Sequence, residues 1–299
     1  MICRWFLPKV ILTLTLALGV CLLPQYADAA DDALWTLRIA NDSFFNQDRG
    51  YTSGLHVERS GAYSPWCFWF GQDIFTPDRN KARQPPQGQH PYGAWLYGGG
   101  EYRAKLNPHA LLTTSLNLGT TGERALGKET QDIAHTVLGF DKYHGWDSQI
   151  SRRWGAIFAL ELEGRLPVWQ HRDGMGADII GRIGGRGGNI YVDADLGATM
   201  RFGYNLPELE EHFFVHPESS LYISVGYDLH MVDKNVFLEG VKSSDYSVKP
   251  ERTYESYQAG VHWRYERYRV DLVLHFPEQY FKHQKYQYRY GVLSLGYWF

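Results

Sequence analysis

The stretch LYISVGYDLHM, residues 221–231, alternates apolar and polar side chains along its whole length. Successive side chains of a β-strand point to opposite faces, so this alternation predicts a strand with one apolar and one polar face. The apolar set is Leu221, Ile223, Val225, Tyr227, Leu229 and Met231, and the polar set is Tyr222, Ser224, Gly226, Asp228 and His230.

The same period of two recurs from one end of the chain to the other. It predicts about a dozen strands, an even number typical of bacterial membrane barrels. The predicted strands lie near residues 34–43, 51–60, 66–75, 92–104, 110–119, 152–163, 176–184, 192–203, 221–231, 258–266, 269–277 and 287–299.

A soluble β-sandwich shows the same alternation, so the position of charge decides between the two folds. Charged residues fall regularly on the face opposite the apolar one, as in a barrel with a polar lumen and an apolar lipid face. Closure of the barrel leaves no strand edge unpaired in hydrocarbon. We therefore predict an all-β fold: a transmembrane antiparallel β-barrel of about twelve strands.

Both ends of the chain favour export to a Gram-negative outer membrane. Arg4 and Lys9 precede the apolar run from Val10 to Leu23, and small residues follow at 27–29. The run is shorter than the ~20 residues that span hydrocarbon, which indicates a cleavable signal peptide over residues 1–29. The chain ends on Phe299, and its last apolar set resembles the signal read by the barrel assembly machinery, a predicted partner during biogenesis.

Composition narrows the remaining alternatives. Lipidation at Cys21 is disfavoured because Val20 stands where a small residue is expected. Without the signal peptide, Cys67 is alone and no intrachain disulfide is possible. The net charge of -3 argues against nucleic acid, whereas 21 Tyr, 10 Trp and 15 Phe suit the aromatic girdles of a barrel. We interpret residues 30–299 as one outer-membrane barrel domain.

Two segments interrupt the strand rhythm. Residues 76–91 are rich in Pro, Gln and Arg and predict a loop, and residues 122–149 contain a helical pattern over 132–138. Outer loops of barrels are longer than periplasmic turns. We therefore predict an extracellular loop that carries a helix.

Residues that could carry chemistry cluster at the first hairpin. Asn41 and Asp42 open it, and Asp48 to Gly54 follow, with more polar groups than a turn needs. Turn formation alone explains most such hairpins. Lys81 fits a solvated loop or a lipopolysaccharide contact equally well, and His135 is either a packed histidine or a general base. No phosphate-binding loop, serine elbow or cysteine-based metal motif is present.

Together these residues resemble the lipid A 3'-O-deacylase family of outer-membrane barrels, over nearly the whole mature chain. The resemblance implies a twelve-stranded barrel whose active site lies toward the outer leaflet, beside a helix of an extracellular loop. It places the catalytic set on Asn41, Asp42, Thr52, Lys81 and His135, and it implies a calcium ion. The motifs that carry it are residues 41–42, 48–54, 72–77, 80–81 and 134–135, continued by Gly139, Lys142, Tyr143, Trp146 and Gln149.

The chemistry that the resemblance implies is ester hydrolysis by water. His135 would deprotonate the water, and the metal with nearby donors would stabilise the oxyanion. Asp42 is the first candidate calcium ligand and Asp141 the second, where the family often has Glu. Strand alternation places Asp42 and Thr52 on polar faces but Asn41 in phase with the apolar set.

Two other functions stay open at this point. A phospholipase would use the same base and metal on glycerophospholipid esters. A noncatalytic channel or structural barrel would use the hairpin only to set register. The prediction is a calcium-dependent hydrolase that removes the 3'-linked acyloxyacyl group of lipid A from lipopolysaccharide.

Overall fold

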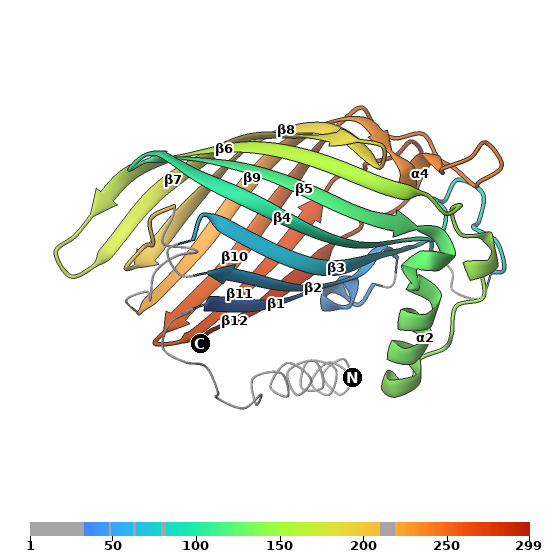
Figure 1. Ribbon diagram of the computed structural model, residues 1–299, viewed down its shortest axis with the longest axis horizontal. Helices are drawn as coiled ribbons and strands as arrows, with labels where there is room; N and C mark the ends of the chain where they lie inside the picture. The colour runs from blue at the N-terminus through green and yellow to red at the C-terminus, as the bar shows by residue number, and fades with distance from the viewer. Residues whose placement is uncertain (1–32, 48, 62–63, 79–81, 210–218) are drawn as a thin grey trace.

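The computed structural model describes residues 33–47, 49–61, 64–78, 82–209 and 219–299. Twelve antiparallel strands form a closed barrel in which each strand pairs with its neighbours in sequence and β1 pairs with β12 (Figure 1). The predicted fold is confirmed. The strands are β1 (Ala33–Asn41), β2 (Gly50–Gly61), β3 (Trp66–Thr76), β4 (Gly93–Asn107), β5 (Ala110–Thr121), β6 (Trp154–Gln170), β7 (Met175–Gly188), β8 (Tyr191–Tyr204), β9 (Ser220–Asn235), β10 (Thr253–Tyr265), β11 (Tyr268–Pro277) and β12 (Tyr290–Trp298).

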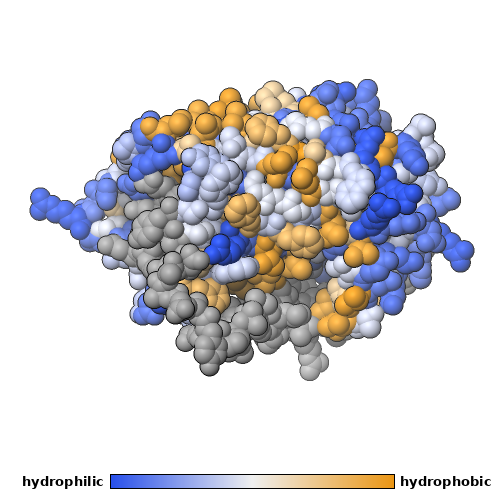
Figure 2. Space-filling model, viewed as in Figure 1, coloured by the Kyte–Doolittle hydropathy of each residue, from blue (hydrophilic) through white to orange (hydrophobic). Residues whose placement is uncertain are grey.

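The alternation of the sequence becomes two faces of the barrel wall. On β6, Phe158, Leu160 and Leu162 point outward and are exposed. The intervening Glu161 points inward, where it forms an ion pair with Arg182 of β7. Figure 2 shows hydrophobic residues over the middle of the wall and hydrophilic residues gathered toward both ends. This distribution suits a lipid-facing outer surface around a polar lumen.

Most of the long connections leave the barrel at one end. They carry η1 (Asp42–Phe45), η2 (Gly122–Ala125), α2 (Gly127–Leu138), η3 (Trp146–Ser148) and α4 (Val236–Glu239). The predicted helix at 132–138 is confirmed and begins five residues earlier. In Figure 1, α2 lies outside the barrel, beside the ends of β3 and β4. No helix within the described ranges is long and apolar enough to cross a membrane.

An apolar plug fills the lumen at this same end. Val236 and Phe237 of α4 are buried against Trp95, Ile157 and other inward-facing side chains of the wall. Phe237 also stacks on Phe75, with ring centroids 4.4 Å apart. The side chains of α4 therefore pack into the barrel, whereas α2 packs on its outer surface.

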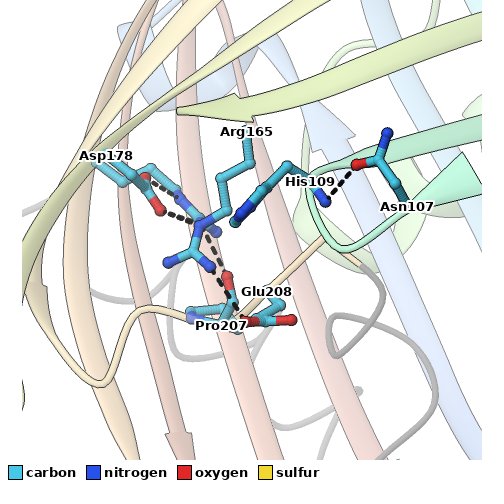
Figure 3. Close-up of polar contacts among 7 residues, drawn as sticks. Asn107, His109, Arg165, Asp178, Pro207 and Glu208 are labelled. Carbon is cyan, nitrogen blue, oxygen red and sulfur yellow. Dashed lines mark hydrogen bonds and ion pairs between the residues drawn. The ribbon is translucent and has the colours of Figure 1, made fainter. Parts of the chain in front are cut away.

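An ion-pair network lies near the opposite end of the barrel, where most turns are short. Arg165 of β6 donates through Nε to Asp178 at 2.6 Å, and Arg201 of β8 donates to the same carboxylate at 2.8 and 2.6 Å (Figure 3).

β6 runs to Gln170, past the predicted end at 163, because its outward side chains stay apolar. Pro167 has no N–H to donate to a neighbouring strand, and it lies beside a shift in the register between β6 and β7.

Candidate active site

A β-bulge in β2 directs the side chain of Thr52 out of the barrel. The ladder pairs Tyr51 with Phe75 and Ser53 with Ile74, so Thr52 is the extra residue. Its hydroxyl lies 2.5 Å from the hydroxyl of Thr76, on the face of β3 that also carries the exposed Phe70. The alternation had placed Thr52 with His56 on the polar inner face, and that placement is wrong. A bulge adds one residue to one strand and so inverts the faces beyond it.

The inner face of the same hairpin is tied down by a hydrogen-bond network. The Tyr51 hydroxyl donates to Asp73 at 2.6 Å, and His56 Nε2 lies 3.0 Å from the same carboxylate oxygen. These contacts hold Tyr51 inside while the next residue turns outward. The bulge is therefore fixed from the lumen side of the wall.

Asn41 and Asp42 lie where β1 passes into η1. Asn41 caps η1 by accepting the Ser43 N–H at 2.7 Å, and it pairs in register with Ser53 of β2. Asn41 is in phase with the exposed Trp35 and therefore lies on the outer face of the barrel, as Thr52 does. Asp42 is buried, and its Oδ2 accepts the Arg49 N–H at 2.5 Å.

Two outward-facing residues of β3 support the helical loop above the wall, and a third contacts the bulge. Gln72 donates to the Ala125 carbonyl at 2.5 Å, which fixes η2 just before α2. Ile74 packs in a buried cluster with Tyr92, Tyr143 and Trp146. Thr76 follows in phase and meets Thr52. One face of the 72–77 motif therefore carries both the helical loop and the bulge.

His135 lies on the buried stripe of α2. Its Nδ1 is 2.6 Å from the Asp141 carbonyl oxygen, and its ring packs edge-on against Tyr143 at 5.3 Å. A carbonyl only accepts, so Nδ1 carries the hydrogen and Nε2 of the neutral ring keeps its lone pair. Within the described chain Nε2 has no hydrogen-bond partner, so this nitrogen can accept a proton.

Contacts along the outer wall connect His135 with the hairpin. Tyr143 touches His135 and shares a cluster with Ile74, which is two residues from Thr76 on the same face of β3. The opposite side of α2 is apolar and exposed, with Ile133 at 66% and Val137 at 61%. The structure thus brings Asn41, Thr52 and His135 to the outer surface of one end of the barrel. Lys81 lies outside the described residues.

Gln131 is a polar residue of the site that the sequence did not single out. It lies one turn before His135 on the buried stripe, and its Oε1 accepts the indole N–H of Trp146 at 2.8 Å. Its Nε2 is buried without a partner among the described groups. The four-residue spacing of Gly127, Gln131 and His135 is the signal that marks this stripe.

The hairpin carries one buried carboxylate of the kind that a hard cation binds. Asp42 offers a carboxylate that is only 2% exposed, and calcium prefers carboxylate, amide and carbonyl oxygens. Asp141 is exposed, and its carbonyl is engaged by His135. Within the described residues, no group of three or more His, Cys, Asp or Glu that could hold a metal ion gathers at one place.

Known outer-membrane proteins are similar to this chain in sequence and in architecture. A family model described as outer membrane protein LpxR matches residues 12–299. The solved structure of LpxR from Salmonella typhimurium superposes with a TM-score of 0.79 at 21% identity, covering 89% of this chain and 100% of that one. At this identity the superposition establishes the fold.

More distant barrels also superpose. The KdgM porin gives a TM-score of 0.41 at 9% identity, covering 89% of this chain and 99% of that one. The COG4313 outer membrane channel from Pseudomonas putida F1 gives 0.42 at 12% identity, covering 93% and 100%. No curated protein sequence matches the chain.

Proposed function

Because the chain belongs to the LpxR family of outer membrane proteins, we propose that it hydrolyses the 3'-linked acyloxyacyl ester of lipid A in the outer leaflet. The observation that carries this proposal is the buried histidine of α2, which keeps a free ring nitrogen at the outer wall. An ester of a membrane lipid would reach such a site without leaving the bilayer.

His135 acts as the general base of the proposed reaction. Its Nδ1–H is held by the Asp141 carbonyl, so Nε2 takes the proton of a water molecule that attacks the ester carbonyl. The tetrahedral intermediate then collapses, the carbon–oxygen ester bond breaks, and the proton passes to the leaving alkoxide. Tyr143 and Phe140 pack against the imidazole and restrict its orientation.

The hairpin supplies the groups that would stabilise the oxyanion. The Thr52 hydroxyl is held at the outer wall by Thr76, and Asn41 and Asp42 lie at the adjoining strand end. Asp42, with Asp141 as a second carboxylate, would hold calcium, which when bound polarises the ester carbonyl. Lys81 completes the proposed set as a cation for an anionic substrate.

The exposed apolar side of α2 suits a lipid substrate. Leu126, Ile133 and Val137 offer surface against which acyl chains can lie beside the proposed base. The same surface serves a glycerophospholipid equally well. The test therefore uses both lipids.

Mass spectrometry of lipid A and of a diacyl phospholipid, each incubated with the refolded protein, tests the proposal. We expect loss of one acyloxyacyl unit from lipid A, abolished by a calcium chelator. His135→Ala should lower the rate by about 10²- to 10⁴-fold, the usual contribution of a general base. His144→Ala is the matched control, because His144 is an exposed histidine of the same loop.

The outcomes separate the alternatives. Cleavage of the phospholipid alone would replace the proposal with a phospholipase, and inertness toward both lipids would replace it with a noncatalytic barrel. Calcium binding is measured separately from hydrolysis. Its readout is the shift in the thermal unfolding temperature when calcium is added to the wild type and to Asp42→Asn. An equal shift in both would remove Asp42 from the metal site.

A further inference from the structure

An open basic pocket lies among the loops at the same end of the barrel as the candidate active site. It has a volume of about 430 Å³ and is formed by three different loops. Two lysines and a histidine supply its charge, and the rest of its lining is small or neutral. The lining residues are Gly88, Ser247, Val248, Lys249, Lys282 and His283.

The floor of the pocket is held rigidly. Pro250 and Phe281 form a β-bridge between the loops of residues 240–252 and 278–289, and the Lys282 N–H donates to the Lys249 carbonyl at 2.8 Å. Beneath it, Leu238, Phe281 and Tyr288 form a buried apolar cluster against which Val248 packs. The two lysines therefore stand on neighbouring segments whose backbones are fixed to one another.

The charge of the pocket is only partly neutralised. Lys282 forms an ion pair with Glu251, a residue that does not line the pocket. Lys249 has no ion pair within the described residues, and the His283 ring adds a hydrogen-bonding group to the lining. Such a lining attracts an anion, and lysine ammonium groups suit phosphate or carboxylate oxygens.

The loops of the pocket are also the loops that border the candidate active site. Tyr286, in the loop that carries Lys282, lies under the Arg49 guanidinium at 4.3 Å, and the Arg289 N–H donates to Gln47. On the third loop, Gln89 accepts the Tyr288 hydroxyl at 2.7 Å beside Gly88. These contacts join the loops of the pocket to the hairpin of the candidate active site.

We propose that this pocket binds an anionic sugar group, a phosphate or carboxylate on the core saccharide of lipopolysaccharide, and so anchors the substrate by its head. The proposal rests on the proposed function for the identity of the substrate, but the pocket itself is a separate site. It predicts that recognition extends beyond lipid A to the sugars attached to it.

A binding measurement tests the pocket without any need for turnover. Delipidated core oligosaccharide that retains its phosphate and carboxylate groups is titrated by calorimetry into the refolded protein, wild type and Lys249→Gln/Lys282→Gln. We expect the double variant to lose about three- to tenfold in affinity, because each exposed charge pair contributes modestly. Raising the salt concentration should weaken wild-type binding in the same direction.

The matched control is Lys242→Gln/Lys285→Gln, which removes one exposed lysine from each of the same two loops away from the pocket lining. It should bind as wild type does. An equal loss in both double variants, or no wild-type binding, would overturn the proposal. Inorganic phosphate that binds as tightly as the oligosaccharide would make this a free-anion site and would also overturn it.

The kinetics of hydrolysis then test whether the pocket contributes to binding of the substrate. The pocket variant should raise KM for substrate that carries the core sugars, with kcat unchanged, and should leave lipid A without core unaffected. A rise in KM for both substrates, or for neither, contradicts substrate anchoring. If wild type cleaves neither substrate, the proposed function fails while the calorimetry still decides whether the pocket binds the saccharide.

Discussion

His90 should make the contact between two outer loops sensitive to acid. Its ring is 1% exposed and packs edge-on against Phe281 and Tyr288, with centroids 6.0 and 5.9 Å away. Burial lowers the pKa of His90 from 6.5 to about 4, although the hydrogen bond to the Pro91 carbonyl acts in the opposite direction. Residues 82–92 of this loop therefore lie closed against the neighbouring loop with this histidine neutral.

The size of the effect follows from the two pKa values. When the loop opens, His90 takes up a proton near pH 6.5, whereas in the closed loop it does so only near pH 4. The closed state thus has its full stability above pH 6.5 and loses stability as the pH falls toward 4. At 1.36 kcal/mol per pKa unit the loss is about 3 kcal/mol, or roughly a hundredfold change in the opening equilibrium.

Hydrogen–deuterium exchange of the segment 82–92 measures this equilibrium. After correction for the intrinsic pH dependence of exchange, protection should fall by roughly a hundredfold between pH 7.5 and pH 4. His90→Phe keeps an aromatic ring against Phe281 and Tyr288 but cannot titrate, so its protection should stay constant. Constant protection in wild type, or an equal fall in His90→Phe, would refute the reasoning.

Three further perturbations test the site and its support. Thr52→Val should lower ester hydrolysis while Thr52→Ser retains it, because only the serine keeps a hydroxyl opposite Thr76; equal rates in wild type and Thr52→Val would remove the hydroxyl from the reaction. Gln131→Leu leaves the buried Trp146 indole N–H unpaired and should destabilise α2 by about 1–3 kcal/mol, seen as faster proteolysis within residues 127–149. Asp245→Ala removes the acceptor of the Ser151, Val241 and Lys242 N–H groups and should speed amide exchange at residue 151, whereas unchanged exchange would contradict this clamp.

The sequence predicted the barrel well because each strand carries its own periodic signal. The strand ends, in contrast, depend on neighbours. β9 continues past the predicted Met231 to Asn235, where the chain turns inward and α4 enters the lumen. The pattern of Val236, Phe237 and Leu238 is too short to distinguish a plug from a strand end. The burial of Val236 and Phe237 follows from side chains of distant strands, and that of Leu238 follows from Phe281 and Tyr288 of a neighbouring loop.

The local inversion at Thr52 shows what periodicity cannot resolve. Strict alternation along β2 places Thr52 inside the barrel with His56. Strict alternation along β1 places Asn41 on the outer face with Trp35. The bulge reverses only the first of these positions, so both residues share the outer face. The position of Asn41 in the apolar phase is therefore consistent with a site on the outer wall.

Two of the apolar clusters at the outer end of the barrel constrain where chemistry can occur. One, around Trp95 and Phe237, fills the lumen, and the other, around Tyr143 and Trp146, lies between the outer wall and α2. The wall between them contributes alternate residues to each, with Ile74 outside and Phe75 inside. A substrate that entered through the lumen would meet the plug, whereas the exposed apolar side of α2, with Ile133 and Val137, faces away from the wall. This arrangement favours a reaction at the membrane-facing surface over passage through the barrel.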